Sequence, residues 1–198
     1  MANESLILAT ASVWRRQLLE STGLRFSARP AGIDEEAIRA DTPAGLALAR
    51  AEAKAMAVAG RHPGALVIGA DQVLSFAGQT QGKPRDRQQA GDRLRSFAGR
   101  THVLHSAYAL ATGGKVRRRN CVDVTMTMRP LTDADIGAYL DTGEWQGCVG
   151  CYQYENRGIH LFPPDHMADQ SAVVGLPLLP LLADLRELGV DALHQASD

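Results

Sequence analysis

Apolar and polar positions along the chain alternate between two periods, one typical of strands and one typical of helices. Short apolar runs and two long runs separated by a Gly-Gly pair predict strands at residues 5–10, 25–29, 66–68, 101–111 and 115–128. Apolar positions three or four residues apart predict helices at residues 13–21, 43–59, 85–97, 131–142 and 177–188. Strands and helices that follow one another in this way favour an α/β protein.

The sequence ALVIGADQVLSFAGQTQGKP is the stretch around which the chain is organised. Its apolar run predicts a strand covered on both faces, and Gly69 lets the backbone come close to another segment. We expect Asp71 and Gln72 where the backbone then leaves the sheet, an edge at which α/β proteins bind ligands. The GQTQGKP turn predicts that Lys83 returns to this edge. Taken alone, this stretch also fits a capped strand end beside a solvated lysine.

A second candidate site lies at the start of the first predicted helix. Ser12 is its expected N-cap, and Arg15 and Arg16 occupy a first turn that is already electropositive. Cations are unfavourable there by themselves, so the pattern indicates an anionic partner such as a triphosphate. A solvated arginine pair is the alternative.

The sequence GIDEE brings three carboxylates together before a weakly predicted helix. Asp34 and Glu35 are candidates to bind a hard cation, although acidic residues at a helix start also stabilise the helix dipole. Lys54, in the alanine-rich helix that follows, is either a phosphate contact or a surface residue. The residues alone do not decide between a cation site and a capped helix start for Asp34 and Glu35, or between the two interpretations of Lys54.

Cys148 and Cys151 form a C-x-x-C pattern. A zinc site is not supported, because the sequence contains no second pair of cysteine or histidine ligands at a suitable spacing. The flanking glycines predict a loop and not the helix N-terminus that lowers a thiol pKa. We therefore expect ordinary packing thiols, reduced like the third cysteine of the chain.

Composition narrows the class of protein. The chain has 198 residues, enough for one sizeable core, and we expect one domain over residues 1–198. The formal net charge of −1 gives no basic field for nucleic acid, and no apolar run is long enough to span a bilayer. The first residues are too short and polar for a secretory signal, so we expect a cytoplasmic protein without nucleic-acid or membrane partners.

Several of these stretches, taken in order, resemble the Maf family of nucleoside triphosphate pyrophosphatases. The stretches are LILATASVWRRQLLE, GIDEE, EAKAMA, VIGADQV, QGKP, GRTH and VVGLPL. The resemblance runs nearly end to end. It implies an elongated mixed sheet flanked by helices, with two lobes around a cleft, similar to inosine triphosphate pyrophosphatases. It also implies that the protein cleaves a nucleoside triphosphate to the monophosphate and pyrophosphate. Whether the protein is a homodimer is left open.

The resemblance also implies roles for individual residues. Asp71, Lys83 and Glu35 become the catalytic residues, with Asp71 as the proton acceptor, and Glu35 and Asp71 become the ligands of Mg²⁺ or Mn²⁺. The expected phosphate-binding residues are Ser12, Arg15, Arg16 and Lys54.

Three further positions resemble the family members that act on 7-methyl-GTP. They are Trp14, Gln72 and Glu155. A methylated guanine ring is cationic, so an indole face and a carboxylate both suit it, the first through cation–π stacking of about 1 to 2 kcal/mol. A pyrophosphatase for dTTP, UTP or many nucleotides is one alternative. A nucleotide-binding regulator of cell division without turnover is another.

Overall fold

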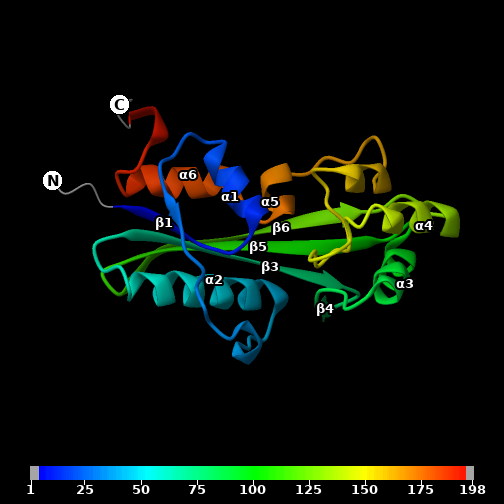
Figure 1. The fold of residues 1–198 in the computed structure, drawn as a ribbon, viewed down its shortest axis with the longest axis horizontal. Coiled ribbons are helices and arrows are strands. Elements are labelled where there is room, and N and C mark those ends of the chain that lie inside the picture. Colours follow the sequence, from blue (N-terminus) through cyan, green and yellow to red (C-terminus); the bar gives the residue numbers. More distant parts are fainter. Residues whose placement is uncertain (1–4, 195–198) are drawn as a thin grey trace.

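The computed structural model describes residues 5–194, within which six strands form one mixed sheet (Figure 1). Five of them lie in the order β2-β1-β3-β5-β6, and β4 pairs with β3. The strands are β1 Leu6–Ala9, β2 Ser27–Ala28, β3 Leu66–Phe76, β4 Gln79–Gln81, β5 Thr101–Thr112 and β6 Lys115–Thr127. The fold is thus of the mixed α/β class that the sequence predicted.

One edge of β3 is paired at its two ends but not in its middle. β5 runs antiparallel along the other edge from Val67 to Ser75. On the open edge, β1 pairs in parallel up to Gly69, and β4 pairs antiparallel only from Leu74 onwards. Within the described part of the chain, no strand pairs with the intervening segment, residues 70–73, on this edge. It includes both polar residues that the sequence analysis singled out.

The expectation that the strand ends before Asp71 and Gln72 is wrong. Both residues lie inside β3, which continues to Phe76. The strand continues because β5 supplies hydrogen-bond partners on one edge even where the other edge is unpaired. A second difference concerns the strand predicted at residues 25–29, which is shorter in the structure: only Ser27 and Ala28 pair with β1.

Helices cover both faces of the sheet (Figure 1). α2 lies on one face, while α1, α5 and α6 lie on the other, and α3 and α4 pack together at one end. The helices are α1 Val13–Glu20, α2 Pro43–Ala59, α3 Arg87–Phe97, α4 Asp133–Asp141, α5 Gln170–Val174 and α6 Leu178–Glu187. Short 3₁₀ turns lie at Glu35–Ala37, Arg157–Leu161 and Ala192–His194.

The contact between α2 and β3 is unusually close. A Cβ atom on Gly69 would lie 2.1 Å from Ala51 O and 2.5 Å from Ala55 N, so only glycine fits at this point. The close approach that the sequence predicted for Gly69 is therefore confirmed, and its partner is α2. Because α2 lies directly on β3, Lys54 comes beside Asp71.

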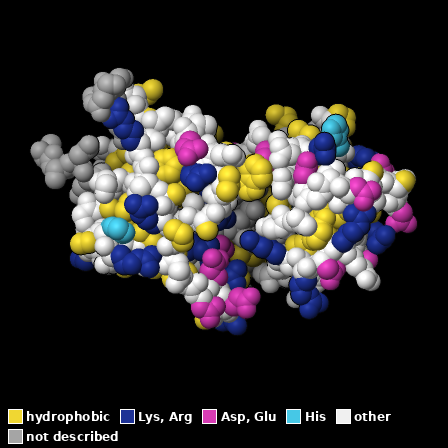
Figure 2. Space-filling view, in the orientation of Figure 1, with side chains coloured by type: hydrophobic (Ala, Val, Ile, Leu, Met, Phe, Trp, Pro, Cys, Tyr) yellow, Lys and Arg dark blue, Asp and Glu magenta, His cyan; other side chains and the backbone are white. Residues whose placement is uncertain are grey.

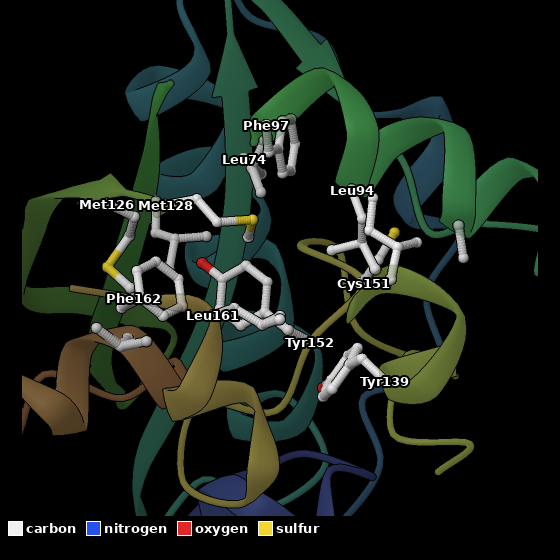
Figure 3. Close-up of a cluster of buried hydrophobic side chains, with 14 of the residues drawn as sticks. Leu74, Leu94, Phe97, Met126, Met128, Tyr139, Cys151, Tyr152, Leu161 and Phe162 are labelled. Atoms are coloured by element: carbon white, nitrogen blue, oxygen red, sulfur yellow. The ribbon is translucent and has the colours of Figure 1, made fainter. Parts of the chain in front are cut away.

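The end of the molecule with α3 and α4 has its own apolar cluster. Figure 3 shows Leu74 of β3, Phe97 of α3 and Tyr152 among its side chains. The loop that carries Cys151 and Tyr152 packs into this cluster, with both residues buried. The cluster therefore fixes the base of the loop that follows α4, which reaches back to the middle of the sheet.

Within residues 5–194, no helix is long and apolar enough to cross a membrane. The division of the chain into a single domain with two lobes stays a prediction.

Candidate active site

The open edge of β3 lies in a cavity of about 1060 Å³. Figure 2 shows the surface hollowed near the middle of the molecule, between the half with α1, α2 and α6 and the half with α3 and α4. The cavity brings together residues from eight separate parts of the chain. Those that the sequence singled out are Ser12, Trp14, Arg15, Glu35, Lys54, Asp71, Gln72, Lys83 and Glu155.

Arg16 does not lie with them. Its side chain is about half exposed and forms an ion pair with Glu20, one helical turn further along, at 3.5 Å. Successive residues on a helix point about 100° apart, so Arg15 and Arg16 cannot face the same cavity equally. Arg15 therefore lines the cavity and Arg16 does not, and the expected contact of Arg16 with a phosphate stays a prediction.

Lys54 is the centre of the charged cluster. Its Nζ lies 2.7 Å from Asp71 Oδ1 and 2.8 Å from Glu35 Oε2. The side chains of Lys54 and Asp71 are only 8% and 7% exposed. Buried charges are stable only when they are paired, and here one ammonium joins two carboxylates. The sequence left Lys54 as a phosphate contact or a surface residue, and the structure makes it a buried ion-pair partner.

The two carboxylates differ in their environment. Partial burial raises the pKa of Glu35, but the hydrogen bond and charge of Lys54, with the charges of Arg50 and Arg15, outweigh it and leave the pKa below its usual value. Asp71 is more deeply buried, and its Oδ2 atom has no hydrogen-bond partner among the described residues. Buried carboxylate oxygens are normally paired, so Oδ2 is an acceptor available to a ligand.

This donor set fits a small hard cation that also contacts a phosphate. No group of three or more histidine, cysteine or carboxylate side chains suited to a metal occurs within residues 5–194. Mg²⁺ is commonly held by one or two carboxylates, with substrate phosphates and water completing its coordination. Glu35 and Asp71 provide such a pair of carboxylates at the cavity.

Arg15 also lines the cavity and is held in place by two contacts. Ser12 Oγ accepts a hydrogen bond from Arg15 N at 3.4 Å, which confirms Ser12 as the N-cap of α1. The Arg15 side chain donates from Nε to Gly175 O at 2.8 Å. Burial lowers the pKa of the Arg15 guanidinium, while the charges of Asp71 and Glu35 raise it. Arginine stays protonated in proteins, so a fixed positive charge faces the cavity.

Gln72 uses its amide nitrogen inside the protein. Gln72 Nε2 lies 2.8 Å from Ser106 Oγ, 3.0 Å from Ala172 O and 2.9 Å from Val173 O. The amide nitrogen therefore holds α5 against β3, and the amide oxygen is the atom left for a ligand. Sequence reasoning missed Ser106 and α5 in this role, because their contacts with Gln72 join positions far apart in the chain.

Trp14 and Glu155 line the same cavity from different segments. Burial raises the pKa of Glu155, and the nearby charge of Glu144 adds to this effect. A carboxylate in such a place gains when a cation arrives beside it. Tyr152 and Tyr154, which the sequence analysis did not single out, also line the cavity and make this part of it aromatic.

A hydrogen-bonded chain of Ser75, His105 and Asp123 lies outside the cavity. His105 Nε2 is 2.8 Å from Ser75 Oγ, and His105 Nδ1 is 2.7 Å from Asp123 Oδ1. This geometry is that of an activated nucleophile. Ser75 nevertheless lies in β3 where both β4 and β5 pair with it, so the nearby backbone donors needed for an oxyanion are committed to the sheet. We assign it no catalytic role.

The C-x-x-C segment is a loop, as predicted. Burial raises the pKa of Cys148 and that of Cys151 to about 11, so both thiols are protonated near neutral pH. Cys151 packs in the apolar cluster of Figure 3, while Cys148 lines the cavity. Neither thiol has the low pKa that redox or metal chemistry requires.

We expect the two cysteines to be dispensable. A Cys148→Ser, Cys151→Ala double variant should keep its pyrophosphate release and its metal content, because neither protonated thiol is a nucleophile or a ligand. Metal analysis of the purified proteins and steady-state kinetics check this. Zinc present in the native protein and lost in the double variant would contradict it.

Comparisons with known proteins agree over nearly the whole chain. The family described as Maf-like protein matches residues 5–188. The chain is 46% identical over 196 residues to the 7-methyl-GTP pyrophosphatase of Rhizobium meliloti (strain 1021), covering 94% of this chain and 98% of that protein. It is 44% identical over 189 residues to the nucleoside triphosphate pyrophosphatase of Rhodopseudomonas palustris (strain BisB5), covering 92% and 93%. It is also 41% identical to the 7-methyl-GTP pyrophosphatase of Bordetella avium (strain 197N), covering 98% of both.

Proposed function

Because the chain belongs to the Maf family, we propose that it hydrolyses a nucleoside triphosphate to the monophosphate and pyrophosphate. Relatives that align with nearly all of the chain carry this activity in their names. The observation that carries the proposal is the buried cluster of Glu35, Lys54 and Asp71 at the open edge of β3. It combines an unpartnered carboxylate oxygen with fixed positive charge, which is what hydrolysis of a phosphate anhydride requires.

Asp71 is the proton acceptor in this proposal. Its Oδ1 is bound to Lys54, so the carboxylate is held in one orientation and Oδ2 is left to accept a proton from water. That water attacks the α-phosphorus, and pyrophosphate leaves. A positioned general base contributes typically about 10²- to 10⁴-fold to the rate.

Glu35 and Asp71 would also hold a divalent cation, Mg²⁺ or Mn²⁺. When bound, the cation would neutralise phosphate charge and act as a Lewis acid. Arg15, Lys83 and the positive end of the α1 dipole supply the remaining positive charge around the phosphates. Lys54 compensates the charge of the two carboxylates and also lines the cavity, where it is a further candidate phosphate contact.

We further propose that 7-methyl-GTP is the preferred substrate. Its methylated base is cationic, and the cavity offers it the indole of Trp14 and the carboxylate of Glu155. Gln72 also lines this cavity, and since its amide nitrogen bonds to Ser106, Ala172 and Val173 within the described residues, Oε1 is the polar atom that it can offer a base. Two of the relatives named above have the same nucleotide in their names.

A Glu155→Gln variant tests the part that charge plays in this preference. Glutamine keeps the size and hydrogen-bonding capacity of the side chain but removes its charge. We expect the ratio of kcat/KM for 7-methyl-GTP to kcat/KM for GTP to fall roughly 5- to 30-fold, which corresponds to about 1 to 2 kcal/mol of transition-state binding. The two substrates are compared in the same variant, so a general loss of activity cancels. Equal losses for both would contradict the assignment.

The same preference should depend on pH. Because burial raises the pKa of Glu155, this carboxylate takes up a proton at a higher pH than an ordinary glutamate. The advantage of 7-methyl-GTP over GTP should therefore be full near neutral pH and shrink as the pH falls through that pKa. In Glu155→Gln the ratio of the two kcat/KM values should not change over this range.

The experiment that tests the proposal as a whole is a panel of nucleotides assayed for pyrophosphate release with Mg²⁺ or Mn²⁺. We expect release to require the metal and to be most efficient with 7-methyl-GTP. More efficient hydrolysis of dTTP or UTP would contradict the base assignment alone. Tight nucleotide binding without turnover would favour a regulator over an enzyme. The homodimer and the cytoplasmic location stay predictions.

A further inference from the structure

A single guanidinium group ties together two segments of the cavity wall. Arg93, on α3, donates from Nη1 to Val149 O at 2.9 Å and also to Gly82 O. Both acceptors line the cavity, Gly82 in the turn after β4 and Val149 in the loop after α4. Nη1 carries two hydrogens, so one nitrogen can serve both carbonyls.

The turn that Arg93 holds is the one that carries Lys83. Gly82 directly precedes Lys83, and β4 before it has only three residues. Residues 82–84 follow β4 outside the sheet, and Lys83 is exposed. A glycine next to a short edge strand has little to restrict it, so an added hydrogen bond at Gly82 limits where Lys83 can lie.

Arg93 donates its hydrogen bonds to two segments of the cavity wall, and its own side chain does not line the cavity. It also lies beside the Cys151 thiol: burial raises the pKa of that thiol, and the charge and hydrogen bond of Arg93 work against this rise. A nucleotide in the cavity would therefore meet Lys83 but not Arg93. Any effect of Arg93 on a bound phosphate has to pass through the segments that it holds.

We infer that Arg93 is a positioning residue, which holds Lys83 against the loop of Cys148 and Val149 so that its ammonium meets the phosphates of the substrate. The inference rests on the proposed pyrophosphatase function. It gives a role to a residue on α3 that lies ten positions from Lys83 and on another element. Catalysis by positioning is sensitive to such supports, since a misplacement of about 1 Å can cost on the order of 100-fold in rate.

An Arg93→Met variant, which keeps most of the length of the side chain but none of its donors, tests the inference. We expect kcat/KM for pyrophosphate release to fall about tenfold, less than for a full misplacement. Arg95→Met is the matched control. It removes the same charge from the same helix, but Arg95 pairs with Asp92 and Asp133 at the surface. Its kcat/KM should stay near that of the native protein.

A double-mutant cycle with Lys83→Ala separates positioning from a general structural role. If Arg93 acts through Lys83, then Arg93→Met should cause little further loss in the Lys83→Ala background. Additive losses in an active protein would overturn the inference and leave the proposed function intact. An inactive native protein would instead contradict the proposed function.

Hydrogen exchange tests the role of Arg93 without any measurement of activity. Faster exchange at Gln79–Gln81 in Arg93→Met supports the inference that Arg93 holds the turn after β4, and unchanged exchange overturns it.

Discussion

Replacing Asp71 by Asn is expected to lower kcat for pyrophosphate release by about 10²- to 10⁴-fold, the range that a positioned general base contributes. Asparagine has nearly the shape of aspartate, and its amide oxygen can still accept the hydrogen bond that Lys54 makes to Oδ1 at 2.7 Å. What is lost is the basic oxygen Oδ2, which is buried without a partner among the described residues. The measurement is steady-state release of pyrophosphate with a metal and saturating nucleotide.

Asp141→Asn is a matched control for this substitution. Asp141 makes the same kind of ion pair with Arg87, at 2.7 Å, but its side chain is 73% exposed and does not line the cavity. The control should have native kinetics. Native turnover in Asp71→Asn, with the fold intact by circular dichroism, would contradict the role of Asp71 as proton acceptor.

Replacing Lys54 by Met is expected to destabilise the fold by about 3 to 5 kcal/mol, because it removes one partner of a buried ion pair and leaves the charge of Asp71 uncompensated. Lys54 and Asp71 are both less than a tenth exposed, so water compensates the lost charge pairing only in small part. Chemical denaturation gives the free energy of unfolding of the native and variant proteins. A loss below about 1 kcal/mol would show that the pair is not buried as described.

Two companion measurements show whether charge is the cause. Asp71→Asn added to Lys54→Met should recover part of the lost stability, because no uncompensated charge then remains at that position.

Glu35 makes the stability depend on pH. Because its pKa is lowered in the folded state, its pairing with Lys54 stabilises the fold above the pKa that Glu35 has in the unfolded chain. That stability is lost as the pH falls through the pKa of the folded state. The difference between native protein and Lys54→Met should therefore narrow in acid.

Local signals in the sequence were sufficient for most of the elements. α2 begins at Pro43 and ends at Ala59 as predicted, because proline is favoured at the first position of a helix and alanine has the highest helix propensity. The hairpin of β5 and β6 turns at Gly113 and Gly114, both of which have positive φ. The capping box of Thr132 and Asp135 starts α4. Each of these features is decided within a few residues.

The parts of the site that sequence could not provide depend on distant segments. The unpaired edge of β3 exists because β1 ends at Ala9 and β4 ends opposite Leu74, which no pattern within β3 reveals. The sequence left Lys54 as either a phosphate contact or a surface residue, and its pairing with Asp71 depends on the close contact of α2 with β3 at Gly69. Gln72 bonds to residues of α5 that follow it by 100 positions or more.

The source of the oxygen added during hydrolysis tests the central claim most directly. Native protein is given 7-methyl-GTP and a divalent metal in water enriched in ¹⁸O, and the products are weighed by mass spectrometry after one turnover. If water attacks the α-phosphorus, the label is in 7-methyl-GMP and the pyrophosphate is unlabelled. Labelled pyrophosphate, or 7-methyl-GDP with orthophosphate, would contradict the account.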